Sequence, residues 1–237
     1  MYQRKSISRI LLWAEPAGLI LTPCILAAAV AAEFEQTALL SLIVISVAML
    51  PFFARFEQRR PKPRDIVPIV VMSVIAAIGR TLLVVFPNVQ PVTAIVIISG
   101  IAFGPQAGFL TGALSALSSN LFLGQGPWTP WQMFGWGLTG YAAGHFQKRG
   151  LFSHPLALYV FGLVVSFLFG ALMNVWVVIG FVRPFAWEAA LTVYLTSIYV
   201  DILHAGSTVV FLLLMARPWL KKLERVKNKY GLFSDLV

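Results

Sequence analysis

Charged residues inside the apolar segments are the first candidates for chemistry in this sequence. Arg80, Asp201 and His204 fall within long hydrophobic stretches, where an ionisable side chain is costly and usually serves a function. Asp201 and His204 are three residues apart, so they share one face of a helix. We expect Arg80 and Asp201 to form an ion pair, which would leave no buried charge alone. A ligand contact or gate is the alternative role.

Aromatic rings and uncharged amides form a second group of candidates. Trp combines a large apolar face with one N–H donor, and amides donate and accept hydrogen bonds without a charge to desolvate. This combination suits a bulky, neutral, amide-bearing ligand better than a phosphate or a metal ion. An interfacial aromatic belt is the alternative, and it is strongest for Trp128. The candidates at the helix ends are Asn88, Gln90, Asn120, Gln125, Trp128, Trp131, Gln132, Trp136, Asn174, Trp176 and Tyr194.

Residue sets typical of enzymes and metal sites are missing from the sequence. Ser115, Ser118 and Ser119 occur without a G-x-S-x-G motif, and an activated serine needs a positioned base. Asp201 and His204 alone do not provide a three-ligand metal site. No Walker motif is present, and the one cysteine, Cys24, excludes an internal disulfide. We therefore expect no catalytic activity, no metal and no resident cofactor.

The composition places these residues in a membrane. The 237 residues are 59% hydrophobic and only 11% charged, against about 25% charged residues in soluble domains. Long uncharged apolar runs predict membrane-spanning helices, and Gly104-Pro105 divides one run of double length. We predict an all-α polytopic membrane protein. Its expected spans are 10–31, 37–54, 66–86, 91–103, 106–121, 130–147, 155–181 and 189–216.

The positive charges predict the orientation of these spans. Sixteen of the 18 Lys and Arg residues lie before the first span, between the second and third, after the sixth and after the eighth. Basic loops stay in the cytoplasm, so we expect a plasma-membrane protein with both termini cytoplasmic. The net charge of +9 then reflects topology and contact with lipid headgroups, not nucleic-acid binding. Residues 4–32 also resemble a signal peptide, but Glu15-Pro16 interrupts that pattern and favours a retained span.

The chain divides into four parts by charge and hydropathy. Residues 1–54 form a two-span extension, 55–65 a basic linker, 66–217 a six-span core, and 218–237 a basic cytoplasmic tail. Two patterns of small residues, Ser73-x-x-x-Ala77 and Gly108–Gly112–Ala116, predict close helix contacts. Internal packing and a partner membrane protein are both compatible with them.

Two stretches carry a family resemblance. One runs from Ile78 to Gly144 and contains "GQGPWTPWQMFGWG"; the other is "SIYVDILHAGS", Ser197 to Ser207. They resemble the substrate-binding S component of an energy-coupling factor (ECF) vitamin transporter, most similarly the cobalamin or corrinoid-precursor type. The resemblance covers roughly residues 66–216. Other vitamins, such as dimethylbenzimidazole, pantothenate or a pterin, are alternatives, as is a membrane enzyme or scaffold.

The resemblance implies a mechanism and partners. An S component binds its vitamin from outside, has no ATPase, and docks on a transmembrane coupling subunit that carries two ABC-type ATPases. Family members dock through an A-x-x-x-A pattern, which Ser73 and Ala77 match here with Ser in the first position. The loop entering the sixth span would form a lid, with Trp131, Gln132 and Trp136 toward the ligand. The implied binding residues are Arg80, Asn88, Asn120, Gln125, Trp128, Trp131, Gln132, Trp136, Asn174, Tyr194, Asp201 and His204.

Overall fold

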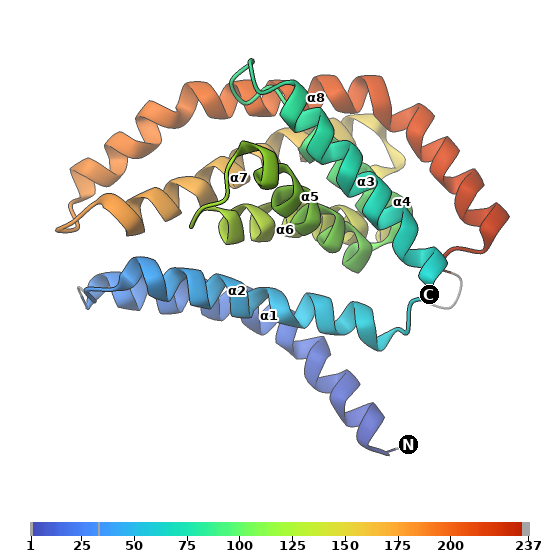
Figure 1. Ribbon diagram of the computed structural model, residues 1–237, viewed down its shortest axis with the longest axis horizontal. Coiled ribbons are helices and arrows are strands. Elements are labelled where there is room, and N and C mark those ends of the chain that lie inside the picture. Colours follow the sequence, from blue (N-terminus) through green and yellow to red (C-terminus); the bar gives the residue numbers. More distant parts are fainter. Residues whose placement is uncertain (1, 33, 234–237) are drawn as a thin grey trace.

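The computed structural model describes residues 2–32 and 34–233 and consists of helices joined by short connections (Figure 1). No strand occurs in these two ranges. The predicted all-α class is confirmed, and most predicted spans begin and end within a few residues of a helix. The elements are α1 (Tyr2–Ala31), α2 (Thr37–Gln58), α3 (Pro63–Leu82), α4 (Val92–Phe103), α5 (Pro105–Leu123), α6 (Thr129–Lys148), η1 (Leu151–Ser153), α7 (Pro155–Phe181) and α8 (Trp187–Tyr230).

Five helices are long and apolar enough to cross a membrane: α1 from Trp13 onward, α2, α3, α7 and α8. This is fewer than the eight spans expected from hydropathy. Helix α4 has only 12 residues, and it is separated from α5 by Gly104, whose φ of 94° ends the helix. Helices α5 and α6 are rich in Gly, Ser and Thr, so their weaker hydropathy reflects surfaces that pack against other helices.

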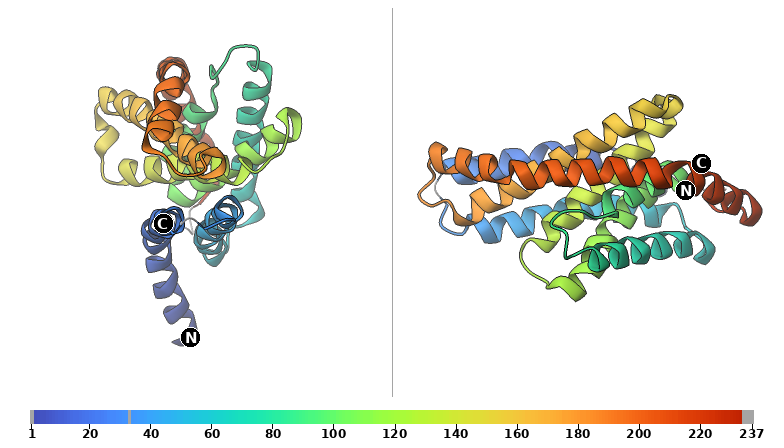
Figure 2. Two further views of the ribbon diagram at one scale, coloured as in Figure 1. Left: turned by 90° about the vertical axis from the view of Figure 1, so that its left-hand side faces the viewer. Right: turned by 90° about the horizontal axis from the view of Figure 1, so that it is seen from above.

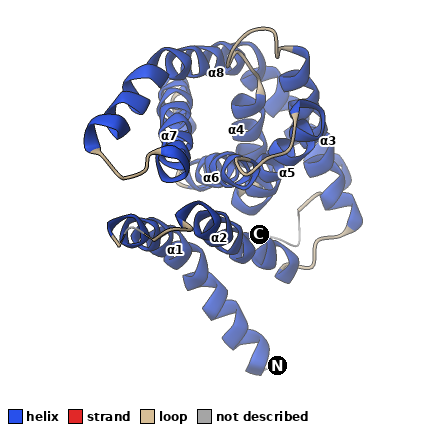
Figure 3. Ribbon diagram, turned by 60° about the vertical axis from the view of Figure 1, so that its left-hand side comes forward, coloured by secondary structure: helices blue, strands red, loops and turns tan. Residues whose placement is uncertain are grey.

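Helices α3 to α8 form the main body, and α1 and α2 lie side by side along one face of it (Figures 1 and 3). Helix α2 packs against α5, α6 and α7. The beginning of α1 and the end of α8 lie at one end of the molecule, whereas the connection from α7 to α8 lies at the other (Figures 1 and 2). This arrangement agrees with an even number of crossings between the two ends of the chain.

The contact among α4, α5 and α6 is made by backbone. A Cβ atom added to Gly108 would lie 2.4 Å from the carbonyl oxygen of Gly140, and one on Gly140 would lie 2.2 Å from the carbonyl oxygen of Gly108. No side chain larger than hydrogen fits at such a crossing. The small-residue pattern of the fifth predicted span therefore serves internal packing.

Ser73 and Ala77 are also internal, which differs from their expected role as a docking surface. Each is only 2% exposed, and the Ser73 hydroxyl lies 3.2 Å from the carbonyl oxygen of Thr111 on α5. A partner helix could not touch this pair unless α3 separated from α5. The small residues let α3 approach α5 closely, so the structure does not place this pair on an exposed surface, and their contact with a coupling subunit stays a prediction.

The basic tail expected from residue 218 is largely helical and packed. Helix α8 continues through Pro218 to Tyr230, because Trp219, Leu220, Leu223 and Val226 follow a helical period and pack against the core. Phe233 is buried after it. The Phe233 amide donates a hydrogen bond to Asp65 Oδ1 at 2.7 Å, so the chain beyond α8 is tied back to the start of α3.

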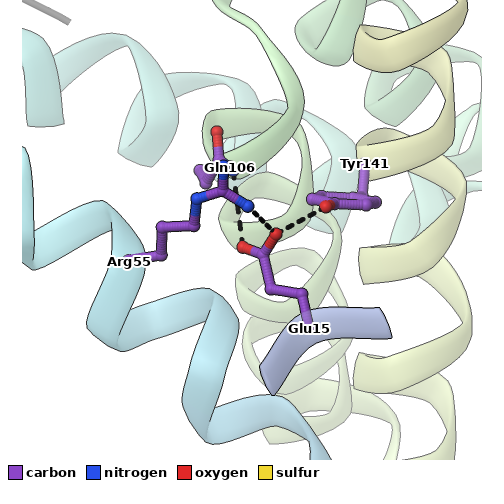
Figure 4. A network of polar contacts seen from close by, with 4 residues as sticks. All are labelled: Glu15, Arg55, Gln106 and Tyr141. Carbon is purple, nitrogen blue, oxygen red and sulfur yellow. Dashed lines mark hydrogen bonds and ion pairs between the residues drawn. The ribbon is translucent and has the colours of Figure 1, made fainter. Parts of the chain in front are cut away.

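A buried polar network joins α1 to the rest of the molecule (Figure 4). Glu15 has no exposed surface, although α1 is otherwise apolar here. Its carboxylate pairs with Arg55 of α2 and accepts hydrogen bonds from the Tyr141 hydroxyl at 2.6 Å and the Gln106 amide at 3.4 Å. We call these four residues the Glu15 network. It links α1, α2, α5 and α6 and gives Glu15 a structural explanation that the sequence did not supply.

Candidate binding site

A cavity of about 220 Å³, here called the polar cavity, lies among α3, α6, α7 and α8. It brings together side chains that are far apart in the sequence. Seven of the binding residues expected from the sequence lie in its wall. The lining residues are Arg80, Asn88, Gln90, Gln132, Trp136, Phe169, Gly170, Met173, Asn174, Ser197, Val200, Asp201 and His204.

Stacked rings form one wall of the polar cavity. Trp136 has no exposed surface, and its ring stacks on Phe169 with 4.5 Å between the ring centres. The Trp136 indole N–H donates to Thr93 Oγ1 at 3.0 Å, and that oxygen lies 2.8 Å from Nε2 of His204. His204 also meets the Phe169 ring edge to face. The aromatic wall is therefore fixed by hydrogen bonds as well as by packing.

Arg80 and Asp201 line the same cavity, but they have separate partners. Arg80 Nη1 donates to Ser119 Oγ at 2.7 Å and Asn120 Oδ1 at 2.8 Å, and its guanidinium carbon lies 4.9 Å from the centre of the Trp136 ring. Asp201 accepts a hydrogen bond from Ser197 at 3.1 Å. The expected Arg80–Asp201 ion pair is absent, because polar groups of α5 bind the guanidinium and leave the carboxylate to face the cavity.

Asn120 and Gln125, two further predicted residues, lie behind the cavity wall. Asn120 Nδ2 donates to Gln132 Oε1 at 2.8 Å and to Thr129 Oγ1 at 2.9 Å. The Thr129 hydroxyl donates to Gln125 Oε1 at 2.9 Å. These bonds orient Gln132 without bringing Asn120 or Gln125 into the cavity. Their role in this structure is support.

The side of the cavity formed by α7 and α8 includes residues that sequence reasoning missed. Asn174 Nδ2 donates to Ser197 Oγ at 2.6 Å, and a Cβ on Gly170 would lie 2.1 Å from Asp201 Oδ1. Ser197 could have been found, since it precedes Asp201 by one helical turn. Phe169, Gly170, Met173 and Val200 could not, because nothing in their local sequence separates them from ordinary membrane-helix residues.

Trp131 faces away from the polar cavity, so the structure does not bring it together with Trp136 in that cavity wall. Residues 131 and 136 are five positions apart, which places them about 140° apart around α6, whereas residues 132 and 136 share a face. Trp131 is fully buried and instead lines an apolar cleft of about 790 Å³ against α1, α7 and α8. Its indole nitrogen has no hydrogen-bond partner among the described residues.

Two other predicted aromatic residues also lie outside the polar cavity. Tyr194 lines the apolar cleft, and its hydroxyl donates to the carbonyl oxygen of Ala171 at 3.3 Å. Trp128 meets Trp176 edge to face with 6.1 Å between ring centres. Its side chain also covers Gly126, so it packs within the loop before α6.

The side chains that line the polar cavity are of the types found in small-molecule binding sites. The cavity combines a stacked aromatic wall with hydrogen-bonding groups of both kinds, and Arg80 and Asp201 add one positive and one negative side chain. Pockets of this composition bind small molecules. Across residues 2–32 and 34–233, no group of three or more His, Cys, Asp or Glu side chains is placed to hold a metal ion.

Comparison with known proteins identifies one matching family model. It is described as "ECF-type riboflavin transporter, S component" and matches residues 62–221. The match runs from just before α3 to the basic part of α8, so it includes every helix that lines the polar cavity and leaves out α1 and α2. No solved structure gives a significant match to the chain.

Proposed function

Since the chain belongs to the family of ECF-type transporter S components, we propose that its polar cavity holds a vitamin and that riboflavin is the substrate. The family assignment rests on residues 62–221. Such a subunit binds and delivers its ligand, and ATP hydrolysis takes place in partner subunits. The position of the polar cavity within the matched helices supports its assignment as the substrate site.

The aromatic wall beside polar side chains is the observation that carries the riboflavin proposal. A flavin has a flat, largely apolar tricyclic ring, and the part of the cavity formed by Phe169 and Met173 next to Trp136 would give it an apolar contact. Its imide edge and hydroxylated side chain need both hydrogen-bond donors and acceptors from the protein. Gln132, Asn174 and Asp201 are placed around the wall to supply them.

Cavity size favours riboflavin over the corrinoid expected from the sequence resemblance. Drug-sized ligands occupy pockets of roughly 300–1,000 Å³, and the polar cavity measures about 220 Å³. A flavin requires modest opening of the cavity, whereas a corrin ring with its side chains requires a several-fold expansion. Cobalamin or a corrinoid precursor is the second candidate, favoured by the resemblance of the Ile78–Gly144 stretch, which contributes Arg80, Gln132 and Trp136.

Because Ser73 and Ala77 are buried between α3 and α5, an exposed surface of α3 is the better candidate for docking on a coupling subunit. The opposite side of α3 carries Val67, Val71, Val74 and Ile78, each between 44% and 58% exposed. Their spacing of three and four residues makes one continuous apolar stripe. We propose that this stripe faces the coupling subunit, which in turn carries two ABC-type ATPases.

One spectrum tests the substrate proposal. The full chain is purified from cells grown with riboflavin and cobalamin. Its visible absorption spectrum is recorded, because flavins and corrins have different spectra. We expect a bound flavin in near-stoichiometric amount, and quenching of riboflavin fluorescence when the emptied protein is titrated with it. A corrin spectrum would replace riboflavin with the second candidate. A colourless protein that fails to bind either compound would rule out both candidates.

A further inference from the structure

A second cavity lies at the opposite end of the helices from the polar cavity. It has a volume of about 500 Å³ and is enclosed by the C-terminal ends of α2, α4, α6 and α8 together with the start of α7. We call it the cationic cavity. Along α8, Lys227 lies about 39 Å from Asp201 at 1.5 Å per residue. The pattern of positive charge assigns this end of the molecule to the cytoplasm.

Three basic side chains line the cationic cavity: Arg59 at the end of α2, Lys148 at the end of α6, and Lys227 on α8. Glu224 is the single acidic lining residue in the described part of the chain. Lys148 follows the predicted sixth span. Burial, and then the neighbouring charges of Arg59, Arg55 and Lys227, lower the pKa of Lys148. The basic groups therefore repel one another, and an anion between them would relieve that repulsion.

Helix termini account for only part of this charge. Cations near the C-terminal end of a helix interact favourably with its exposed carbonyl groups. Lys227 does so directly, because its ammonium group donates to the carbonyl oxygen of Ala102 near the end of α4 at 3.1 Å. Arg59 and Lys148 end their own helices, yet both also line one shared cavity. Interaction with helix ends does not explain why Arg59 and Lys148 line the same cavity.

Much of the remaining cavity wall is apolar, although Gln106 and Gln147 also line it. Phe56, Phe103 and Leu158 are all less than 10% exposed, and Phe152 and Leu220 complete the same surface. Phe152 and Leu220 are only partly buried, so a small inorganic anion would leave their exposed surface without an apolar contact. A molecule with an anionic head and a hydrocarbon chain would contact both the basic groups and the apolar wall.

We propose that the cationic cavity binds an anionic phospholipid of the cytoplasmic leaflet. The phosphodiester group would lie among Arg59, Lys148 and Lys227, and the first part of an acyl chain would cover Phe152 and Leu220. Clusters of Lys and Arg between helices on the cytoplasmic side are suited to such headgroups. This site is independent of the polar cavity and of the vitamin that it binds.

Lipid retention by charge variants tests the proposal. The full chain is released from membranes, stripped of lipid and titrated with phosphatidylglycerol or phosphatidylcholine, and bound lipid is counted by native mass spectrometry. We expect phosphatidylglycerol to bind the natural chain, and the double variant Arg59→Gln/Lys148→Gln to bind it about 30-fold more weakly. The matched control is Lys221→Gln/Lys222→Gln, which removes the same charge from exposed positions outside the cavity. Its affinity should change less than twofold.

Two further measurements identify the ligand. Leu220→Asn should weaken phosphatidylglycerol binding several-fold, because it disturbs the apolar wall and leaves all three basic groups in place. Inorganic phosphate at millimolar concentration should not displace the lipid. Displacement by phosphate would make this a free-anion site and overturn the lipid proposal. Equal losses of phosphatidylglycerol affinity in the cavity and control variants would also overturn the proposal. So would cavity variants that no longer bind a coupling subunit but still bind the lipid.

Discussion

The polar cavity and the Glu15 network both place charged and amide side chains among apolar helices, but they differ in how completely those groups are bound. In the Glu15 network, both carboxylate oxygens are taken by Arg55, Tyr141 and Gln106. In the polar cavity, Asp201 accepts one bond from Ser197, and Gln132 accepts one from Asn120. A satisfied polar cluster holds helices together. A cluster with unused donors and acceptors around a cavity can bind a ligand.

Breaking the Glu15 network should have the largest effect on stability. In Glu15→Ala, the Arg55 guanidinium loses its carboxylate partner in a setting where its side chain is only 19% exposed. We expect the free energy of unfolding in detergent to fall by roughly 3 kcal/mol. Vitamin affinity below the unfolding transition should change less than twofold. The double variant Glu15→Met/Arg55→Met should recover much of the lost stability, and failure to do so would show that the ion pair is not the main contribution of these residues.

A methyl group at Gly170 should have the opposite pattern of effects, with a large change in vitamin affinity and a smaller change in stability. The added Cβ would lie 2.1 Å from Asp201 Oδ1, so the carboxylate must move and reshape the ligand site. We expect Gly170→Ala to weaken vitamin binding about 30-fold, or about 2 kcal/mol, with a smaller change in stability. The control on the same helix is Gly180→Ala, since nothing lies within 4 Å of a Cβ there. If the two variants bind alike, Asp201 does not contribute to the site.

A comparison of Gln132 with Trp131 should sharpen the assignment of the two faces of α6. Gln132→Ala removes one hydrogen-bonding group from the polar cavity, and we expect affinity to fall about fivefold, or about 1 kcal/mol. Trp131→Phe changes only the apolar cleft and should leave affinity within twofold. Isothermal titration of both variants with the vitamin measures these two affinities and so tests which face of α6 lines the ligand site. Weaker binding in Trp131→Phe alone would contradict the orientation of α6.

Ser73→Ala should have the smallest effect. The hydroxyl of Ser73 bonds to the carbonyl oxygens of Ile69 and Thr111, both of which lie within helices. We expect stability to change by less than about 0.5 kcal/mol, and vitamin uptake by cells to stay unchanged. A loss of more than about 1 kcal/mol would contradict the small contribution assigned to this hydroxyl.

The sequence predicted the helices well because apolar runs and their breaks are local properties. Gly104-Pro105 correctly marked the break between α4 and α5, and the polar residues on α3, α6, α7 and α8 indicated much of the cavity lining. Helix rotation was harder to predict. In a membrane, both lipid-facing and buried surfaces are apolar, so hydropathy did not reveal which way Trp131 or Ser73 points.

The hydrogen-bond and ion-pair partners of the buried charged residues also could not be predicted from local sequence. Arg80 and Asp201 were natural partners by charge, but the nearer groups on α5 are the neutral Ser119 and Asn120. Glu15 entered the sequence analysis only as a break in a signal-peptide pattern, whereas its three partners in the structure come from three other helices. Such contacts depend on tertiary packing.

The backbone contact among α4, α5 and α6 has a consequence for evolution of the binding site. Gly100, Gly108 and Gly140 leave no room for a methyl group between these helices, so this side of the polar cavity cannot be remodelled by small steps. Trp136 is carried on that fixed surface. Change of substrate among descendants of this protein should therefore arise mainly on α7 and α8, where Asn174, Ser197 and Asp201 can be exchanged without separating the helices that hold the aromatic wall.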